Sequence, residues 1–230
     1  GCGLPNKWNV FLQLKENKKL QPYFLPTSKY SLSNLKQLLL VHKKVILKPI
    51  NGSQGFGILK IEQLNEDMFL CVEVTKEGEQ PFYFSSVQQI NIWIKKKETF
   101  FIVQPFLTLL TARNEPFDLR ILLQKGENGT WFERFRAIRH GGDGKVTANL
   151  ATGGKIVKYN DWIKSFSKNE KSSIEGKIED VVKTLLTDLD EKFHPLFEIA
   201  LDIAIDCNLN VWILDMNSKP GHKMIEMVAE

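Results

Sequence analysis

Apolar and polar residues in the first hundred positions form short alternating runs, the pattern typical of β-strands that bury one face. The expected strands are KWNVFLQL at 7–14, KVILKPI at 44–50, GILKIEQL at 57–64, FLCVEVT at 69–75, PFYFSS at 81–86 and ETFFIVQPFL at 98–107. Leucines at helical spacing predict a helix after a cap at Ser31 or Ser33, and a short helix is expected near 86–96. The proline-punctuated stretch 21–30 is expected to be extended.

A second group of elements is expected from about residue 108 onward. It comprises strands at 117–124 and 130–139 around a KGENG turn, a glycine-rich connection at 141–154, a helix over roughly 168–200 and a hairpin at 201–217. Runs of strands separated from a few helices predict an α+β fold rather than a doubly wound sheet.

Composition narrows the class of protein. A chain of 230 residues with 43% hydrophobic residues is expected to fold around a proper core, and a formal charge of +4 does not favour nucleic-acid binding. The three cysteines are far apart, which suggests neither a disulfide framework nor a zinc site. The most apolar window, at 196–205, contains two carboxylates and is too short for a membrane span, and no signal peptide is evident. A cytoplasmic location is therefore expected.

The last hairpin places charge at the end of an apolar strand. If its CNLN turn is symmetric, position 206 faces 211, 204 faces 213 and Asp202 faces Asp215. Strand alternation then puts Asp202, Asp215 and Asn217 on one face. The opposite, core face would hold Leu201, Ile203, Ile205, Trp212, Leu214 and Met216. Like charges directly opposite one another destabilise a strand pair, and two carboxylates with an amide oxygen suit Mg²⁺. The alternative, that both aspartates face solvent with a lysine nearby, stays open on spacing alone.

A second cluster lies at 45–59, where a strand, a glycine-rich loop and another strand follow one another. Gly52, Gly55 and Gly57 would let backbone amides approach phosphate oxygens, and Lys48 ends the entering strand. Neither a Walker A loop nor a dinucleotide fingerprint fits, because no Lys-Ser/Thr pair and no helix follow the glycines. The loop predicts a flap over phosphates, although a glycine-rich hairpin on its own is more often merely a hairpin.

Taken together, these features resemble the ATP-grasp superfamily, and within it the endospore coat-associated YheC/YheD-like group. The matching stretches, in order, are LPTSKYS, VILKPINGSQGFGI, FIVQPFL, PFDLRILLQ, AIRHGGDGKVTANLATGG and WILDMNSKPG. The resemblance implies two α/β lobes whose antiparallel sheets clasp ATP between them. It divides the chain into an N-terminal extended segment (1–28), a small lobe (29–107) and a C-terminal lobe with the magnesium hairpin (108–230). The first segment would be the remnant of, or the replacement for, a preceding domain.

The resemblance also implies roles for individual residues. Lys48 would contact the α-phosphate or adenine edge, while Arg120 would point at the γ-phosphate or an acyl phosphate. The other implied nucleotide-binding residues are Gly52, Ser53, Gly55 and Gly57 over the phosphates, and Val103, Gln104 and Phe106 in a hinge that meets adenine. Arg139 and Asn149 would line the transfer site, and Asp202, Asp215 and Asn217 would bind Mg²⁺.

The implied activity is that of an ATP- and Mg²⁺-dependent ligase that joins a carboxylate to an amine or thiol through an acyl phosphate. The acid and the acceptor are not specified by the sequence, and a peptide acceptor is one alternative. Another is a non-catalytic, nucleotide-binding spore-coat or assembly protein.

Overall fold

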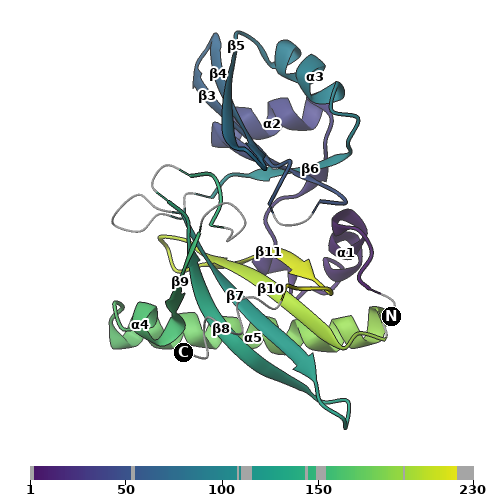
Figure 1. The fold of residues 1–230 in the computed structure, drawn as a ribbon, viewed down its shortest axis with the longest axis vertical. Coiled ribbons are helices and arrows are strands. Elements are labelled where there is room, and N and C mark those ends of the chain that lie inside the picture. The colour runs from purple at the N-terminus through teal and green to yellow at the C-terminus, as the bar shows by residue number, and fades with distance from the viewer. Residues whose placement is uncertain are drawn as a thin grey trace.

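The computed structural model describes residues 3–52, 55–107, 109, 116–142, 145–148, 154–193 and 195–221. Two lobes, each built on an antiparallel sheet, lie one above the other in Figure 1. Their cores are separate: one includes buried residues between 35 and 103, and the other includes residues between 10 and 20 and between 117 and 213. The boundaries at residues 28 and 107 stay predictions.

The small lobe is a six-stranded sheet with two helices packed on one face. Its strands, in the order β1-β6-β2-β3-β4-β5, are β1 (Ser28–Lys29), β6 (Phe101–Pro105), β2 (Lys44–Pro49), β3 (Leu59–Asn65), β4 (Met68–Thr75) and β5 (Gly78–Phe84). The helices are α2 (Leu32–His42) and α3 (Val87–Lys95). Ser31 caps α2, as one of the two predicted caps, by accepting a hydrogen bond from the Asn34 amide. Val45 and Leu47 of β2 point into the core, so Lys48 is on the opposite face of the sheet.

The large lobe is a five-stranded sheet covered on one face by a long helix. Its strands, in the order β11-β10-β7-β8-β9, are β11 (Val211–Asn217), β10 (Glu198–Ile205), β7 (Phe117–Lys125), β8 (Trp131–His140) and β9 (Lys155–Lys158). The helices are α4 (Tyr159–Ile163) and α5 (Lys168–Lys192). Ser167 and Glu170 form a capping box that starts α5. The helix ends at Lys192, earlier than the expected residue 200, because Pro195 and then β10 follow.

The N-terminal segment is helical, so the strand predicted at 7–14 is wrong. This segment forms α1 (Lys7–Leu14) and a 3₁₀ turn, η1 (Gln21–Tyr23). The Asn6 side chain caps α1 by accepting a hydrogen bond from the Asn9 amide, and Val10 and Leu14, four residues apart, pack into the large-lobe core. The same apolar spacing fitted a strand on paper, but the cap and the core contacts favour the helix.

The terminal hairpin pairs Asp202 with Asp215, as predicted, but the register nearer the turn differs from the predicted one. A β-bulge lies between this pair and the Ile203–Ile213 pair, leaving Leu214 as the extra residue. Positions nearer the turn are therefore shifted by one, and the predicted pairs 204–213 and 206–211 are wrong. Val211 and Ile213 face the core, whereas Trp212, predicted to be buried there, is half-buried and donates its indole N–H to Asp206.

Among the helices in the described ranges, none has both the length and the apolar character that crossing a bilayer requires.

Candidate nucleotide site between the lobes

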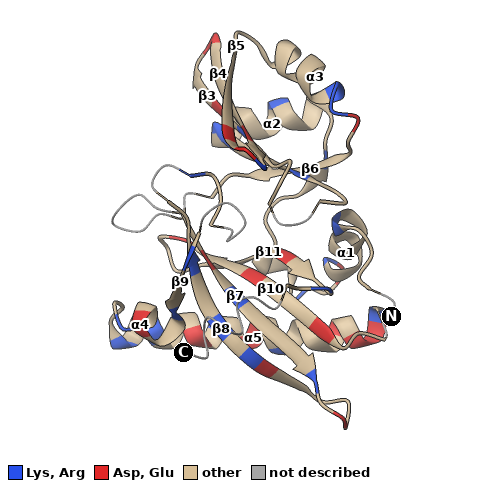
Figure 2. Cartoon of the chain, in the orientation of Figure 1, with Lys and Arg blue, Asp and Glu red and all other residues tan. Residues whose placement is uncertain are grey.

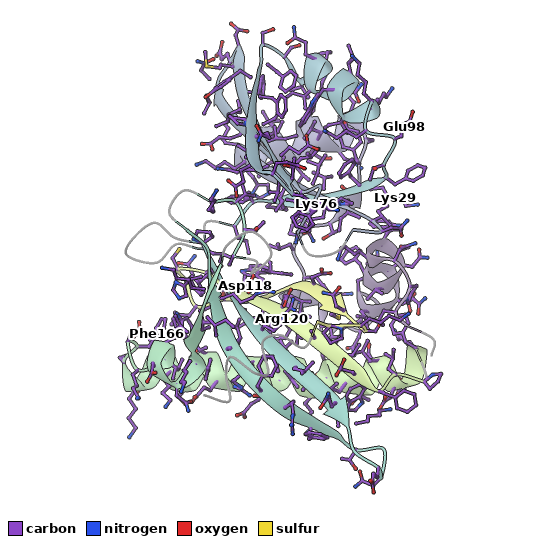
Figure 3. All side chains as sticks on the ribbon, in the orientation of Figure 1. Lys29, Lys76, Glu98, Asp118, Arg120 and Phe166 are labelled. Atoms are coloured by element: carbon purple, nitrogen blue, oxygen red, sulfur yellow. The ribbon has the colours of Figure 1, made fainter. Side chains whose placement is uncertain are left out.

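Charged side chains gather on the face of the large-lobe sheet that α5 leaves uncovered. Leu119 and Ile121 of β7 point toward α5 in the core, so the alternating residues Asp118 and Arg120 lie on the other face. Figure 3 places both near the end of β7 that faces the small lobe, and Figure 2 shows the charged residues on the neighbouring strands. Cross-strand pairing brings Arg120 beside Asp202.

Two arginines and two aspartates form a buried network at this place. Arg120 holds both carboxylate oxygens of Asp202, from Nε and Nη2 at 2.7 Å each. Arg139 holds Asp118 in the same bidentate way, at 2.6 and 2.8 Å, and its Nη2 also lies 3.0 Å from Asp202. Arg139 is only 3% exposed and Asp202 6%. Burial alone would raise the pKa of Asp202, but the two guanidinium groups outweigh it and hold that pKa well below its usual range.

Asp215 has a different partner. Lys7 of α1 places its ammonium against the Asp215 carboxylate, with Nζ 2.6 Å from Oδ1. The Asn217 side-chain amide donates to the same carboxylate only at 3.5 Å. Asp202 and Asp215 are therefore opposite each other, but separate cations neutralise them in this structure. The alternative left open by the sequence, two solvent-facing aspartates with a lysine nearby, is wrong for the buried Asp202, while its lysine corresponds to Lys7 at Asp215.

Lys48 comes from the small lobe and ends beside the bulge of β11. Its Nζ donates a hydrogen bond to the carbonyl oxygen of Leu214, 3.2 Å away, which joins the strand of the glycine-rich loop to the acidic hairpin. Burial, with a smaller contribution from Lys7, lowers the pKa of Lys48 to about 8 against the opposing effect of the Asp215 carboxylate. The ammonium therefore lies close to the metal-ligand candidates and is mainly charged below pH 8.

The glycine-rich loop connects β2 and β3, as expected. Gly55 and Gly57 adopt positive φ, of 83° and 73°, a region that side chains disfavour. A side chain on Gly52 would meet Pro49, its Cβ 2.9 Å from the proline Cβ, so the loop turns tightly there. Ser53 lies outside the described residues.

The predicted hinge is the end of β6. Val103 is paired on both sides, with Ser28 and Leu47, and the Phe106 amide donates to the Lys44 carbonyl at 3.0 Å. The backbone of these two residues thus serves the sheet. Gln104 donates from Nε2 to the Thr27 hydroxyl at 2.8 Å, whereas its Oε1 is buried with no hydrogen-bond partner among the described residues.

These positions test whether ATP and Mg²⁺ fit. Gln104 alternates with the buried Val103, so it lies on the same sheet face as Lys48, and its orphaned oxygen suits an amino group such as that of adenine. Asp202, Asp215 and Asn217 offer oxygen ligands only, which suits Mg²⁺. Within the described ranges no three His, Cys, Asp or Glu side chains form a metal cluster, and the predicted set includes an amide, Asn217, beside its two carboxylates. The magnesium set stays a prediction.

Five of the predicted site residues lie around this one junction, and two relevant neighbours were missed. Lys48, Arg120, Arg139, Asp202 and Asp215 are joined by the contacts above. Asn149 lies outside the described residues.

Lys7 was missed because its helix was taken for a strand, and nothing in the local sequence links it to Asp215. Asp118 could have been found: it is two residues before Arg120, so it shares the face of that arginine.

Comparison with known proteins agrees with this architecture. The profile of the YheC/D-like ATP-grasp family matches residues 1–230, so the chain belongs to that family. ATP-grasp proteins bind nucleotide and generally act as ATP-dependent ligases, with ATP and Mg²⁺ used in general. The predicted α+β, two-lobe ATP-grasp fold is thereby confirmed.

Two curated relatives come from Bacillus subtilis (strain 168). The endospore coat-associated protein YheC is 30% identical over 231 residues, covering 100% of this chain and 63% of the relative. The endospore coat-associated protein YheD is 28% identical over 229 residues, covering 95% of this chain and 49% of the relative. The chain thus spans less than two thirds of the length of either protein.

Proposed function

We propose that this protein is an ATP- and Mg²⁺-dependent ligase that activates a carboxylate as an acyl phosphate and transfers the acyl group to an amine or thiol. The observation that carries the proposal is the hydrogen bond from Lys48 to the Leu214 carbonyl. It brings the glycine-rich loop of one lobe and the acidic hairpin of the other to a single place. A nucleotide triphosphate requires both: cations and amides for phosphate oxygens, and carboxylates for the metal that accompanies them.

Each residue of the proposed site has a role in nucleotide binding that follows from its chemistry. Lys48 supplies a point charge to the phosphates, and the Gly55 amide supplies a hydrogen-bond donor, whereas the Gly57 amide already donates to the Val74 carbonyl at 2.8 Å. Arg120 is fixed in orientation by its bidentate contact with Asp202, so its guanidinium can meet a phosphoryl oxygen without reorganising. Gln104 accepts from the purine amino group through its unpaired oxygen.

Asp215, Asn217 and Asp202 would hold Mg²⁺, of which Asp215 is the more accessible carboxylate because Asp202 is held by two arginines. When bound, the ion neutralises charge that develops on the phosphate oxygens. Electrostatic positioning of this kind needs no nucleophilic side chain, and Arg139 and Asn149 are assigned to the transfer side of the site.

The test is ATP turnover in the presence of candidate acceptors. Purified protein is incubated with MgATP and a panel of carboxylic acids paired with amines, thiols or short peptides, and release of ADP and phosphate is measured. Acceptor-dependent release that is lost in Asp215→Asn supports the proposal. Tight MgATP binding without turnover over the whole panel, peptides included, would exclude a ligase.

A second candidate is a nucleotide-binding component of the spore coat without catalytic activity, and both relatives, which are endospore coat-associated proteins, support the coat part of it. Retention of the charged network speaks against complete loss of the site. A third is a ligase whose acceptor is a peptide made elsewhere. Capture of a peptide by the MgATP-loaded protein, followed by ADP release, would separate the peptide ligase from the coat protein.

A further inference from the structure

The contact between Lys7 and Asp215 is built into the fold rather than made by a free surface chain. Lys7 starts α1, whose Val10 and Leu14 are buried in the large-lobe core. The Lys7 backbone amide also donates to the carbonyl of Ile50, at the entrance of the glycine-rich loop. The helix thus attaches to both lobes at the place where the lobes meet.

The chain before Lys7 is held against the same strand. The Leu4 amide donates to the Ser218 hydroxyl at 2.8 Å, one residue beyond the end of β11. The side chains of Lys7 and Asp215 are 17% and 25% exposed, so the ion pair is partly shielded from water but still open to exchange. Lys7 is therefore held beside Asp215 by the backbone amides of Leu4 and Lys7 and by the packing of α1.

The ammonium uses the lone pairs that a metal would need. Lys7 Nζ lies within hydrogen-bond distance of both Asp215 oxygens. A divalent cation on the same carboxylate would stand next to this ammonium and would be repelled by it. Lys48 is a second cation beside the same strand and shares the electrostatic field of Lys7 and Asp215. The ion pair and the metal are consequently alternatives at Asp215.

Lys7 needs to move only its side chain to leave Asp215 free for the metal. Lysine is a compact charge on a flexible four-carbon stem, which can leave a carboxylate for a phosphate oxygen without moving its backbone. The Lys7 backbone amide is hydrogen-bonded to Ile50, the residue that precedes the glycine-rich loop. Phosphates bound under that loop would therefore lie near Lys7.

We propose that Lys7 is a positioning residue that occupies Asp215 in the nucleotide-free protein and transfers to a phosphate oxygen when the metal–nucleotide complex binds. The inference rests on the proposed function above. It makes metal and nucleotide binding mutually dependent: metal alone must displace the ammonium into water, whereas nucleotide offers the ammonium a new anionic partner.

The test compares Lys7→Met with wild type in two separate titrations. The first measures Mn²⁺ binding without nucleotide by electron paramagnetic resonance. The second measures binding of a non-hydrolysable ATP analogue in EDTA by calorimetry. The Met variant should bind Mn²⁺ roughly tenfold more tightly, because Asp215 is freed, and bind metal-free analogue several-fold more weakly, because a cation is lost. The exposed Lys18, changed to Met, is the matched control and should move neither value.

Opposite shifts distinguish this role from a purely structural one, since a misdocked α1 would weaken both affinities. Lys7→Arg checks the same point with the ion pair retained: a bidentate guanidinium should make Mn²⁺ binding weaker than in wild type. Unchanged or weakened Mn²⁺ binding in Lys7→Met overturns the inference, while MnATP binding by wild type leaves the proposed function standing. Failure of wild type and variants to bind either metal or nucleotide defeats both.

Discussion

Lys48 Nζ lies 3.2 Å from the carbonyl oxygen of Leu214, although the two residues belong to different lobes and are 166 positions apart in the chain. This hydrogen bond joins the strand that enters the glycine-rich loop to the strand that carries Asp215. A chain that needed only two packed sheets would have no use for an ammonium at such a place, because burial works against its charge.

The lowered pKa of Lys48 predicts how nucleotide affinity depends on pH. The ammonium is charged below a pKa of about 8 and neutral above it, so affinity for ATP should fall as pH rises through 8. The slope should approach about tenfold per pH unit if this single proton is required. Calorimetric titrations between pH 7 and 10 measure it. Lys48→Arg stays charged over this range and should give a flat profile; a slope in that variant equal to the wild-type slope would assign the effect elsewhere.

The charged Lys48 should also lower the free energy of unfolding of the protein. Its folded-state pKa is below its ordinary value, so the charged form is disfavoured on folding; the cost is fully present below pH 8 and disappears as pH rises toward 10.5. Lys48→Met should therefore have a free energy of unfolding about 1–3 kcal/mol higher than wild type at pH 7, and should unfold at a higher urea concentration. This gain in stability should shrink at high pH. Lys36→Met, at an exposed site on α2, is the control and should show no such gain.

Asp202 and Asp215 should respond differently to the same substitution. Asp202→Asn leaves Arg120 and Arg139 poorly neutralised in a buried network, a loss expected to cost about 3–5 kcal/mol of unfolding free energy. Asp215→Asn breaks a partly exposed pair with Lys7, which is worth only about 1 kcal/mol or less. Urea denaturation at pH 7 compares them, and equal losses would contradict the division of roles.

Asp215→Asn should nevertheless remove metal-dependent nucleotide binding. The carboxylate is the accessible oxygen ligand of the proposed set, and an amide cannot supply its charge. Binding of the ATP analogue with and without Mg²⁺ provides the measurement. Retention of the full magnesium effect in Asp215→Asn would place the metal site outside this hairpin.

Gly57→Ala and Gly129→Ala form a matched pair of loop substitutions. Both glycines have positive φ, 73° and 76°, so each alanine should cost about 1 kcal/mol through backbone strain. A Cβ on Gly57 would also lie 3.1 Å from Pro49 Cγ, inside the glycine-rich loop, whereas one on Gly129 meets no atom within 4 Å. Only Gly57→Ala should weaken nucleotide binding; similar affinities in the two variants would argue against a phosphate-binding loop.

Sequence reasoning succeeded where local rules determine the outcome. Most strands of both lobes follow from alternation, although β9 was not predicted, and Ser31 follows from helix capping. The pairing of Asp202 with Asp215 followed from a two-strand register. Each of these depends on residues that are near one another in the chain or across one turn.

What it missed depends on contacts that no local pattern encodes. Residues 7–14 fit a strand and a helix almost equally, and the helix is selected by Asn6 and by packing against the large-lobe core. The β-bulge that exchanges the roles of Trp212 and Ile213 leaves no recognisable signature in the sequence VWILDMN. The partners of the two aspartates, Lys7 and the arginines, come from three other elements, so no local pattern distinguishes a metal from an arginine or a lysine.

The bulge at Leu214 has a consequence for how this hairpin tolerates change in length. Asp215 opposite Asp202 and Ile213 opposite Ile203 would be consecutive rungs of an ordinary ladder if Leu214 were deleted. In the shortened strand Ile213 would still face the core and Asp215 would still lie on the opposite face. The strand would lose the peptide group that accepts from Lys48, and with it one of the hydrogen bonds that join the lobes. One residue that is dispensable for the sheet thus supplies an acceptor for the contact between the two lobes.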